Sequence, residues 1–226
     1  LAQGAIAGML KTNAAPFIHP SFAKRVTPGN LEDDLGLIGD CDWICEAIIE
    51  NPEIKRDLYT KLEGVRKKGS IVSSNTSTIP LAELVKGLPD GFVADFAITH
   101  FFNPPRYMRL LEVVGGPKTR PEAIAALKAY GDRALGKEVI AAKDTPGFIG
   151  NRIGIYWSHV APTEAYDQGL TVEEAVHKMT QATATLFGLG DRGVLAPGYV
   201  GDANVIDHQR LELRRPELVD DLPGGA

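Results

Sequence analysis

The amino-acid sequence predicts an α/β protein with a mainly parallel sheet that contains one antiparallel strand pair, followed by a smaller all-α domain. Short β-prone runs alternate with amphipathic helical segments up to about residue 142, which is typical of a parallel sheet covered on both faces. Asn103-Pro104-Pro105 is too short for a parallel crossover, so the strands on either side of it should be antiparallel. After Pro146 and Gly147 only helical patterns follow.

Each element of the predicted sheet domain has a local signal. Apolar and β-branched runs predict strands at 42–48, 69–74, 94–101, 108–114 and 137–142. Amphipathic periodicity predicts helices at 52–68, 80–87 and 121–135. Pro52 at the start of the first helix suits a helix N-terminus, because proline lacks only an N–H that would have no partner there. The order strand, helix, strand over residues 42–74 is a βαβ unit.

The second predicted domain is helical. Residues 151–169 read as a long helix interrupted near Pro162, and residues 171–188 as a helix capped by Thr171 with Glu174 three residues on. Pro146 and Gly147 punctuate the junction, so the predicted domains are 1–144 and 145–226. After about residue 187 the many glycines indicate loops, although 202–215 could form a helix that would expose His208.

Composition excludes several classes of protein. The 226 residues carry a formal charge of −5 without a long basic run, so no nucleic-acid partner is expected. No apolar stretch approaches the roughly 20 residues of a membrane-spanning helix. We therefore expect a cytoplasmic protein. Cys41 and Cys45 are expected to be buried reduced thiols, and no metal site is predicted because no second Cys/His cluster accompanies them.

A histidine and a carboxylate lie inside two otherwise apolar strands. In a hairpin centred near residue 106, His100 and Glu112 are equidistant from the centre and can face each other. A carboxylate beside a histidine fixes its tautomer and favours the imidazolium, so the pair could take a proton from an alcohol. The alternative is a structural histidine hydrogen-bonded in a turn.

Three further polar segments follow strands or lie at the domain junction. They are "SSNTST" (73–78), "ENPEIK" (50–55) and "KDTPGFIGNR" (143–152). The carboxyl ends of strands and domain junctions are the positions where α/β proteins bind ligands. Taken singly, each segment could also be a turn, a helix cap or solvated surface.

The segments "EAIIENPEIK", "SSNTST", "THFFNPPRYMRLLEVV" and "KDTPGFIGNRI" together resemble 3-hydroxyacyl-CoA dehydrogenases of the long, multifunctional type, over about residues 30–175. The resemblance implies a Rossmann-like domain, NAD as cofactor, and oxidation of (S)-3-hydroxyacyl-CoA to 3-ketoacyl-CoA in fatty-acid β-oxidation. It also implies an acyl-CoA substrate, and either a homodimer or a fused or associated enoyl-CoA hydratase.

The resemblance also assigns roles to particular residues. His100 matches the catalytic base and Glu112 the carboxylate that orients it. Ser77 matches the serine that hydrogen-bonds the reacting oxygen, and Asn151 the amide that helps to hold substrate and histidine. Three residues match the cofactor side: Glu50, Lys55 and Asn75.

The sequence departs from this family at its beginning. No strand followed by a G-x-G-x-x-G turn is present, and Gly4 and Gly8 follow no strand, so "QGAIAGML" reads as a helical insertion. We therefore expect a family member without its N-terminal portion, which would bind NAD weakly. Two alternatives remain: a truncated, inactive acyl-CoA-binding or assembly fragment, and another NAD(P) dehydrogenase of the β-hydroxyacid type, which lacks this histidine and glutamate pattern.

Overall fold

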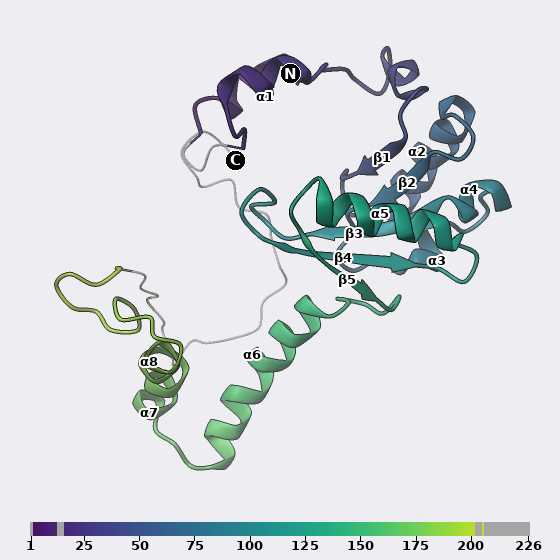
Figure 1. Ribbon diagram of the computed structural model, residues 1–226. Coiled ribbons are helices and arrows are strands. Elements are labelled where there is room, and N and C mark those ends of the chain that lie inside the picture. Colours follow the sequence, from purple (N-terminus) through teal and green to yellow (C-terminus); the bar gives the residue numbers. More distant parts are fainter. Residues whose placement is uncertain (1, 13–15, 202–204, 206–226) are drawn as a thin grey trace. The chain divides into compact units, whose positions relative to one another are not determined.

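The computed structural model describes residues 2–12, 16–201 and 205 of the chain. Within these residues the centre is a five-stranded sheet of order β1-β2-β3-β4-β5 (Figure 1). The strands are β1 (Trp43–Glu46), β2 (Ile71–Ser74), β3 (Phe96–Phe101), β4 (Leu110–Gly115) and β5 (Glu138–Ala142). Neighbouring strands are parallel except β3 and β4, which are antiparallel. The predicted mainly parallel sheet with one antiparallel pair is therefore confirmed.

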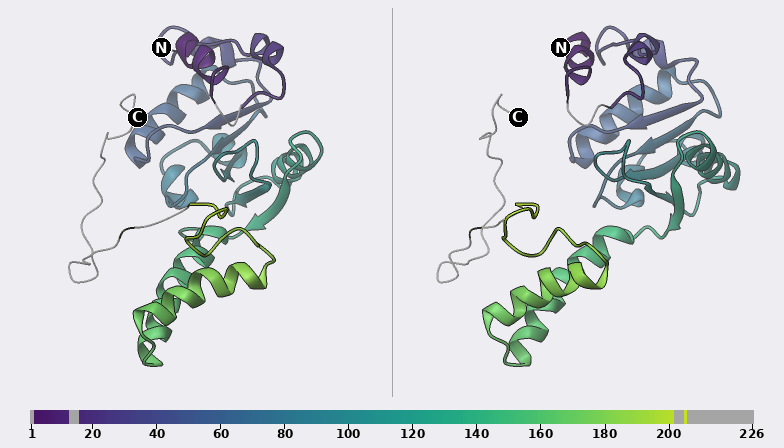
Figure 2. Two further views of the ribbon diagram at one scale, coloured as in Figure 1. Left: turned by 90° about the vertical axis from the view of Figure 1, so that its left-hand side faces the viewer. Right: turned by 60° about the vertical axis from the view of Figure 1, so that its left-hand side comes forward.

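Helices cover both faces of the sheet (Figures 1 and 2). They are α2 (Pro52–Val65), α3 (Leu81–Leu84), α4 (Asp90–Ala94) and α5 (Pro121–Arg133). On one face, Leu84 of α3 and Tyr59 of α2 join an apolar cluster with Phe96 of β3. On the other face, Leu127 of α5 packs with Val113 of β4. The alternation of strand side chains between two clusters is the pattern of a sheet buried on both faces.

The residues at the N-terminus of α2 explain where this helix begins. The Asn51 side chain accepts hydrogen bonds from the N–H groups of Glu53 and Ile54, and Pro52 takes the first helical position. The helix places Leu58 and Tyr59 in the core. The short helix α4 was not predicted, because its residues continue into the apolar run that forms β3.

The chain divides into two compact units, Leu1–Tyr156 and Trp157–Ala226. The first also contains α1 (Ala2–Met9) and two 3₁₀ turns, η1 (Pro20–Arg25) and η2 (Leu35–Ile38). The helix α6 (Gly150–Asp167) starts in the first unit and ends in the second. The predicted boundary at 144/145 lies just before the start of α6. No helix in the described part of the chain is long and apolar enough to cross a membrane.

The second unit is helical in its described residues. After α6 it contains α7 (Val172–His177), a π-helical turn η3 (Lys178–Ala182) and α8 (Thr183–Leu186). Thr171 Oγ1 accepts from the N–H of Glu174, whose carboxylate accepts from the N–H of Thr171, so the predicted cap is confirmed. The predicted interruption near Pro162 is wrong, because α6 is continuous; a proline removes one backbone hydrogen bond without necessarily ending a helix. His208 and the possible helix at 202–215 lie outside the described residues, apart from Val205.

The prediction for the two cysteines is partly wrong. Both thiols are free, but Cys41 is only half-buried and Cys45 is exposed. In the described sheet β1 pairs with β2 alone, so Cys45 lies on an outer strand. The sequence could not show this, because it does not determine which strand takes the edge.

A buried ion pair fixes the amino end of β3. Asp95 accepts from Arg66 Nη1 at 2.8 Å and from Arg120 Nε at 2.5 Å, and Asp95 is 6% exposed. Arg66 ends α2 and Arg120 precedes α5, so this carboxylate joins helices from both faces of the sheet.

Asp95→Asn should destabilise the protein, because the substitution leaves the nearly buried Arg66 guanidinium without a charged partner on this side. Breaking such a pair costs roughly 3 kcal/mol, which urea unfolding would measure. The control is Asp90→Asn, which removes an exposed pair with Lys118 and should leave the urea midpoint almost unchanged. Equal effects of the two substitutions would contradict this account.

Candidate active site

The antiparallel pairing of β3 and β4 brings the predicted histidine and carboxylate together. His100 and Glu112 are directly opposite each other in the register. Their side chains point to the same face, and His100 Nδ1 lies 2.7 Å from Glu112 Oε2. Glu112 is fully buried and His100 is 4% exposed. An ionised carboxylate can only accept, so this contact favours the tautomer with its proton on Nδ1 and its lone pair on Nε2.

The other oxygen of Glu112 holds the start of α6. Glu112 Oε1 accepts from the N–H groups of Ile149 at 2.9 Å and of Gly150 at 2.8 Å. These are N–H groups that a helix N-terminus leaves without an internal partner, and a negative charge there is favourable. The turn that delivers them is strained, since the buried Phe148 has a φ of 45°.

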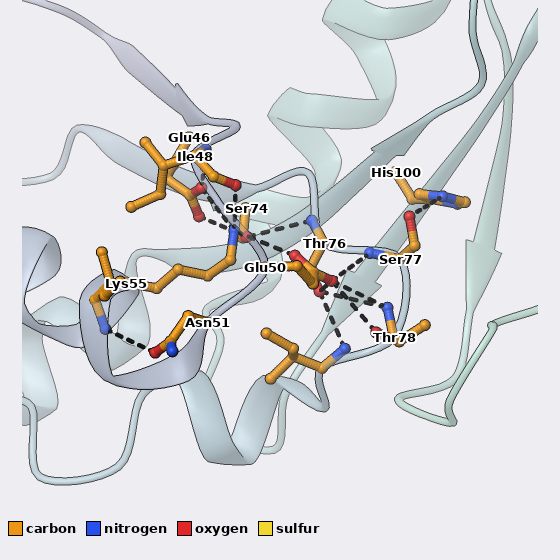
Figure 3. Close-up of polar contacts among 12 residues, drawn as sticks. Glu46, Ile48, Glu50, Asn51, Lys55, Ser74, Thr76, Ser77, Thr78 and His100 are labelled. Carbon is orange, nitrogen blue, oxygen red and sulfur yellow. Dashed lines mark hydrogen bonds and ion pairs between the residues drawn. The ribbon is translucent and has the colours of Figure 1, made fainter. Parts of the chain in front are cut away.

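His100 Nε2 faces a serine from the neighbouring strand's loop. Ser77 Oγ lies 3.2 Å from Nε2, as Figure 3 shows. The imidazole is enclosed by Phe102 and Phe148, with ring centroids at 4.6 Å and 5.4 Å. A Cβ on Gly150 would lie 2.7 Å from Phe102, so the helix can approach this ring only with glycine there. The histidine therefore has one open polar direction, toward Ser77.

The turn that carries Ser77 is organised by Glu50. Glu50 Oε1 accepts from the Thr76 hydroxyl, from the Ser77 N–H at 3.1 Å and from the Thr78 N–H at 3.4 Å (Figure 3). Burial acts to raise the pKa of the Glu50 carboxyl, but the Thr76 hydroxyl, the Ser77 N–H and the Lys55 ammonium outweigh it and hold that pKa below its usual range. Glu50 is therefore ionised at neutral pH.

The two other residues predicted on the cofactor side have internal partners. Asn75 Oδ1 accepts from the N–H of Phe101 at 2.9 Å, which ties the loop after β2 to the end of β3. The Lys55 side chain is only 1% exposed, and its ammonium lies 2.7 Å from Glu46 and 3.4 Å from Glu50. Of the three predicted cofactor residues, Glu50 has the most accessible side chain, with 41% exposed.

Asn151 lies in the first turn of α6 and lines a neighbouring cavity of about 430 Å³. The lining residues are Thr78, Pro146, Gly147, Gly150, Asn151, Gly154 and Ile155. Among the described residues no hydrogen bond joins Asn151 to His100 or Ser77. The cavity is mostly apolar and includes Thr78, the residue after Ser77, so it can accept an apolar group.

Sequence reasoning missed two residues that shape this site. Glu46, the last residue of β1, is buried beneath the loops and binds Lys55 and Ser74. The available signal was a glutamate inside the mainly apolar strand predicted at 42–48. Phe148 covers the histidine from a strained turn; its segment, 143–152, was predicted as a ligand position at the domain junction, but no role was predicted for Phe148 itself.

Glu112, His100 and Ser77 lie together at the carboxyl end of the parallel strands, where open α/β sheets bind ligands. The family model for 3-hydroxyacyl-CoA dehydrogenase, NAD binding domain, matches residues 3–145. The chain belongs to the 3-hydroxyacyl-CoA dehydrogenase family.

Relatives extend this finding. A probable 3-hydroxyacyl-CoA dehydrogenase of Deinococcus radiodurans is 38% identical over 94% of this chain and 60% of its own length. A putative fatty acid oxidation complex trifunctional enzyme of Rickettsia felis is 37% identical over 94% of this chain and 28% of its own. The solved (S)-3-hydroxybutyryl-CoA dehydrogenase of Ralstonia eutropha gives a TM-score of 0.64 at 26% identity, covering 84% of this chain and 64% of that one. The chain spans between 22% and 60% of the first four curated relatives it matches.

A second family model, described as amidohydrolase family, matches residues 91–223. It overlaps the first model over residues 91–145, which contain β3, β4, α5 and β5. The Deinococcus and Rickettsia relatives each align with 94% of the chain, so they also account for most of this region. In the described residues no three His, Cys, Asp or Glu side chains are grouped as a metal site requires.

Polar side chains lie at the edge of the sheet where open α/β proteins bind nucleotides. The exposed Glu50 carboxylate and the Ser77 hydroxyl lie at the carboxyl ends of β1 and β2, where open α/β sheets bind nucleotides. Before β1, the described residues include no strand with a glycine-rich turn that could hold a diphosphate.

Glu50→Gln should reduce the acid sensitivity of the fold. Because the pKa of folded Glu50 lies below its ordinary value near 4.5, the unfolded chain binds more protons just under that pH. The stabilisation is therefore complete above about pH 4.5 and is lost as the pH falls through the folded value. Urea midpoints measured between about pH 6 and pH 3 should fall less steeply for Glu50→Gln than for the parent.

The matched control for this titration is Glu53→Gln, an exposed glutamate in the first turn of α2. Its acid limb should stay close to the parent's. An unchanged acid limb in Glu50→Gln would mean that the Glu50 carboxylate does not hold the Ser77 turn in solution.

Proposed function

We propose that the protein containing this chain oxidises (S)-3-hydroxyacyl-CoA to 3-ketoacyl-CoA with NAD in fatty-acid β-oxidation. The observation that carries the proposal is the pair of polar contacts made by the His100 imidazole. Its Nδ1 is held by the buried Glu112 and its Nε2 faces the Ser77 hydroxyl. Membership of a family whose matched domain binds NAD supports the same reaction.

The proposed chemistry separates a proton from a hydride. The His100 Nε2 lone pair accepts the proton of the C3 hydroxyl, and the adjacent Glu112 carboxylate stabilises the imidazolium that forms. The Ser77 hydroxyl donates to the same oxygen while the C3–O bond gains double-bond character. NAD, when bound, accepts the hydride that leaves C3. One O–H bond and one C–H bond break, and one carbonyl forms.

The remaining predicted residues divide between substrate and cofactor. Asn151 and Thr78 line a mostly apolar cavity, which suits the first carbons of an acyl-CoA. Glu50 and Asn75 belong to the cofactor side, and Lys55 acts there through Glu50. A homodimer, or a fused or associated enoyl-CoA hydratase, is the partner that this function implies. The Rickettsia relative's name as a trifunctional enzyme of a fatty acid oxidation complex supports the second arrangement.

Replacing the base tests the proposal. In the intact protein, His100→Ala should lower NAD-dependent oxidation of 3-hydroxybutyryl-CoA by roughly 100-fold or more, because no other group near the hydroxyl accepts its proton. NADH absorbance measures the rate. The control is His177→Ala, an exposed histidine of α7. A His100→Ala rate within about threefold of the parent would remove His100 as the base.

NAD affinity tests the alternative of a binding fragment. Residues 1–226 alone should bind NAD about a thousandfold more weakly than the same chain preceded by a family-type strand, G-x-G-x-x-G turn, helix and strand. The reason is that backbone N–H groups of such a turn hold the diphosphate, and three decades of affinity correspond to about 4 kcal/mol. Calorimetry provides the measurement. Micromolar binding by residues 1–226 alone would contradict this prediction.

A further inference from the structure

The buried carboxylate of Glu46 has no role in the proposed reaction but lies beneath the loops that form the site. Glu46 ends β1, its side chain is 1% exposed, and it does not reach His100 or the cavity. It accepts four hydrogen bonds, as Figure 3 shows in part. The donors are Ser74 Oγ at 2.7 Å, Tyr59 Oη at 2.5 Å, Ile48 N at 2.6 Å and Lys55 Nζ at 2.7 Å. Four donors compensate the cost of burying one charge.

Lys55 connects Glu46 to Glu50, which lies nearer the surface. Its ammonium has three N–H groups, and three acceptors surround it: Glu46 Oε1 at 2.7 Å, the Ile48 carbonyl at 3.3 Å and Glu50 Oε2 at 3.4 Å. The side chain is as buried as that of Glu46. The ammonium therefore donates to a fully buried carboxylate and forms an ion pair with a half-exposed one.

Glu50 connects Lys55 to the turn that contains Ser77. Its Oε2 faces Lys55, and its Oε1 takes the N–H groups of Ser77 and Thr78. The Ser77 hydroxyl then lies 3.2 Å from His100 Nε2. In Figure 3 these contacts form a continuous row from Glu46 through Lys55 and Glu50 to His100.

We infer that Glu46 is a positioning residue for the Ser77 hydroxyl, acting through Lys55 and Glu50. It fixes the ammonium, the ammonium fixes the outer carboxylate, and the outer carboxylate fixes the turn. Placing a donor within a few tenths of an ångström is what such buried supporting contacts achieve in catalytic sites. The catalytic meaning of Ser77 rests on the proposed function, whereas the geometric link does not.

The competing explanation is that Glu46 only stabilises the fold, and a double substitution separates the two. Glu46→Gln keeps acceptor capacity for Ser74 and Tyr59 but leaves Lys55 buried beside a neutral group. Adding Lys55→Met removes the buried charge and should restore much of the stability. The double variant should therefore keep a stable core, but it lacks the ammonium that pairs with Glu50.

Amide hydrogen exchange followed by NMR, without cofactor or substrate, reads out the turn directly. In Glu46→Gln with Lys55→Met, the Ser77 and Thr78 amides should exchange about tenfold faster than in the parent, relative to core amides of β3. Asp95→Asn, which disrupts the buried ion pairs at the other end of β3, should not show this local change. If the double variant does not fold, Glu46→Gln alone is compared with Asp95→Asn in the same way.

Parent-like exchange at Ser77 and Thr78 in the double variant would overturn the inference. So would equal local acceleration in Asp95→Asn, since that would reflect general destabilisation. Because the readout needs no turnover, it is independent of the proposed reaction. Local acceleration combined with an active His100→Ala would uphold the positioning role and remove the proposed function alone.

Discussion

The buried carboxylate of Glu112 is the contact on which the rest of the site depends. One oxygen contacts His100 Nδ1 and the other accepts from the N–H groups of Ile149 and Gly150, so a single side chain holds the imidazole and the start of α6. A fully buried carboxylate is tolerated only with such donors. Removing Glu112 would therefore release both the imidazole and the turn containing Phe148, which encloses it.

A second set of carboxylates, Glu46 and Glu50, lies on the side of the histidine formed by the parallel strands. Glu46 and Glu50 lie at and after the end of β1, and their partners come from α2 and the loop after β2. The two systems meet where Ser77 faces His100. Both polar partners of the imidazole are thus fixed before any ligand arrives, so little reorganisation is needed during reaction. Thr78, which follows Ser77, lines the cavity that contains Asn151.

The sequence predicted the parts of the fold that follow from periodicity and loop length. The short Asn103-Pro104-Pro105 connection determined that β3 and β4 are antiparallel, and symmetry about it placed His100 opposite Glu112. Burial of charged residues was not predictable, since Lys55 looks like the solvated face of an amphipathic helix. Its partner Glu46 comes from another element, and only the packed structure joins them. Cys45 was misjudged because strand order decides which strand is at the edge.

The most direct test of the central contact is the protonation of the His100 ring, measured by ¹⁵N NMR of the isotope-labelled protein at mildly alkaline pH. The Glu112 contact predicts a proton on Nδ1 and a bare lone pair on Nε2. That tautomer is the one able to accept a hydroxyl proton in the direction of Ser77. A proton found on Nε2, with Nδ1 bare, would contradict the account, because Glu112 could then neither orient the imidazole nor support its charge.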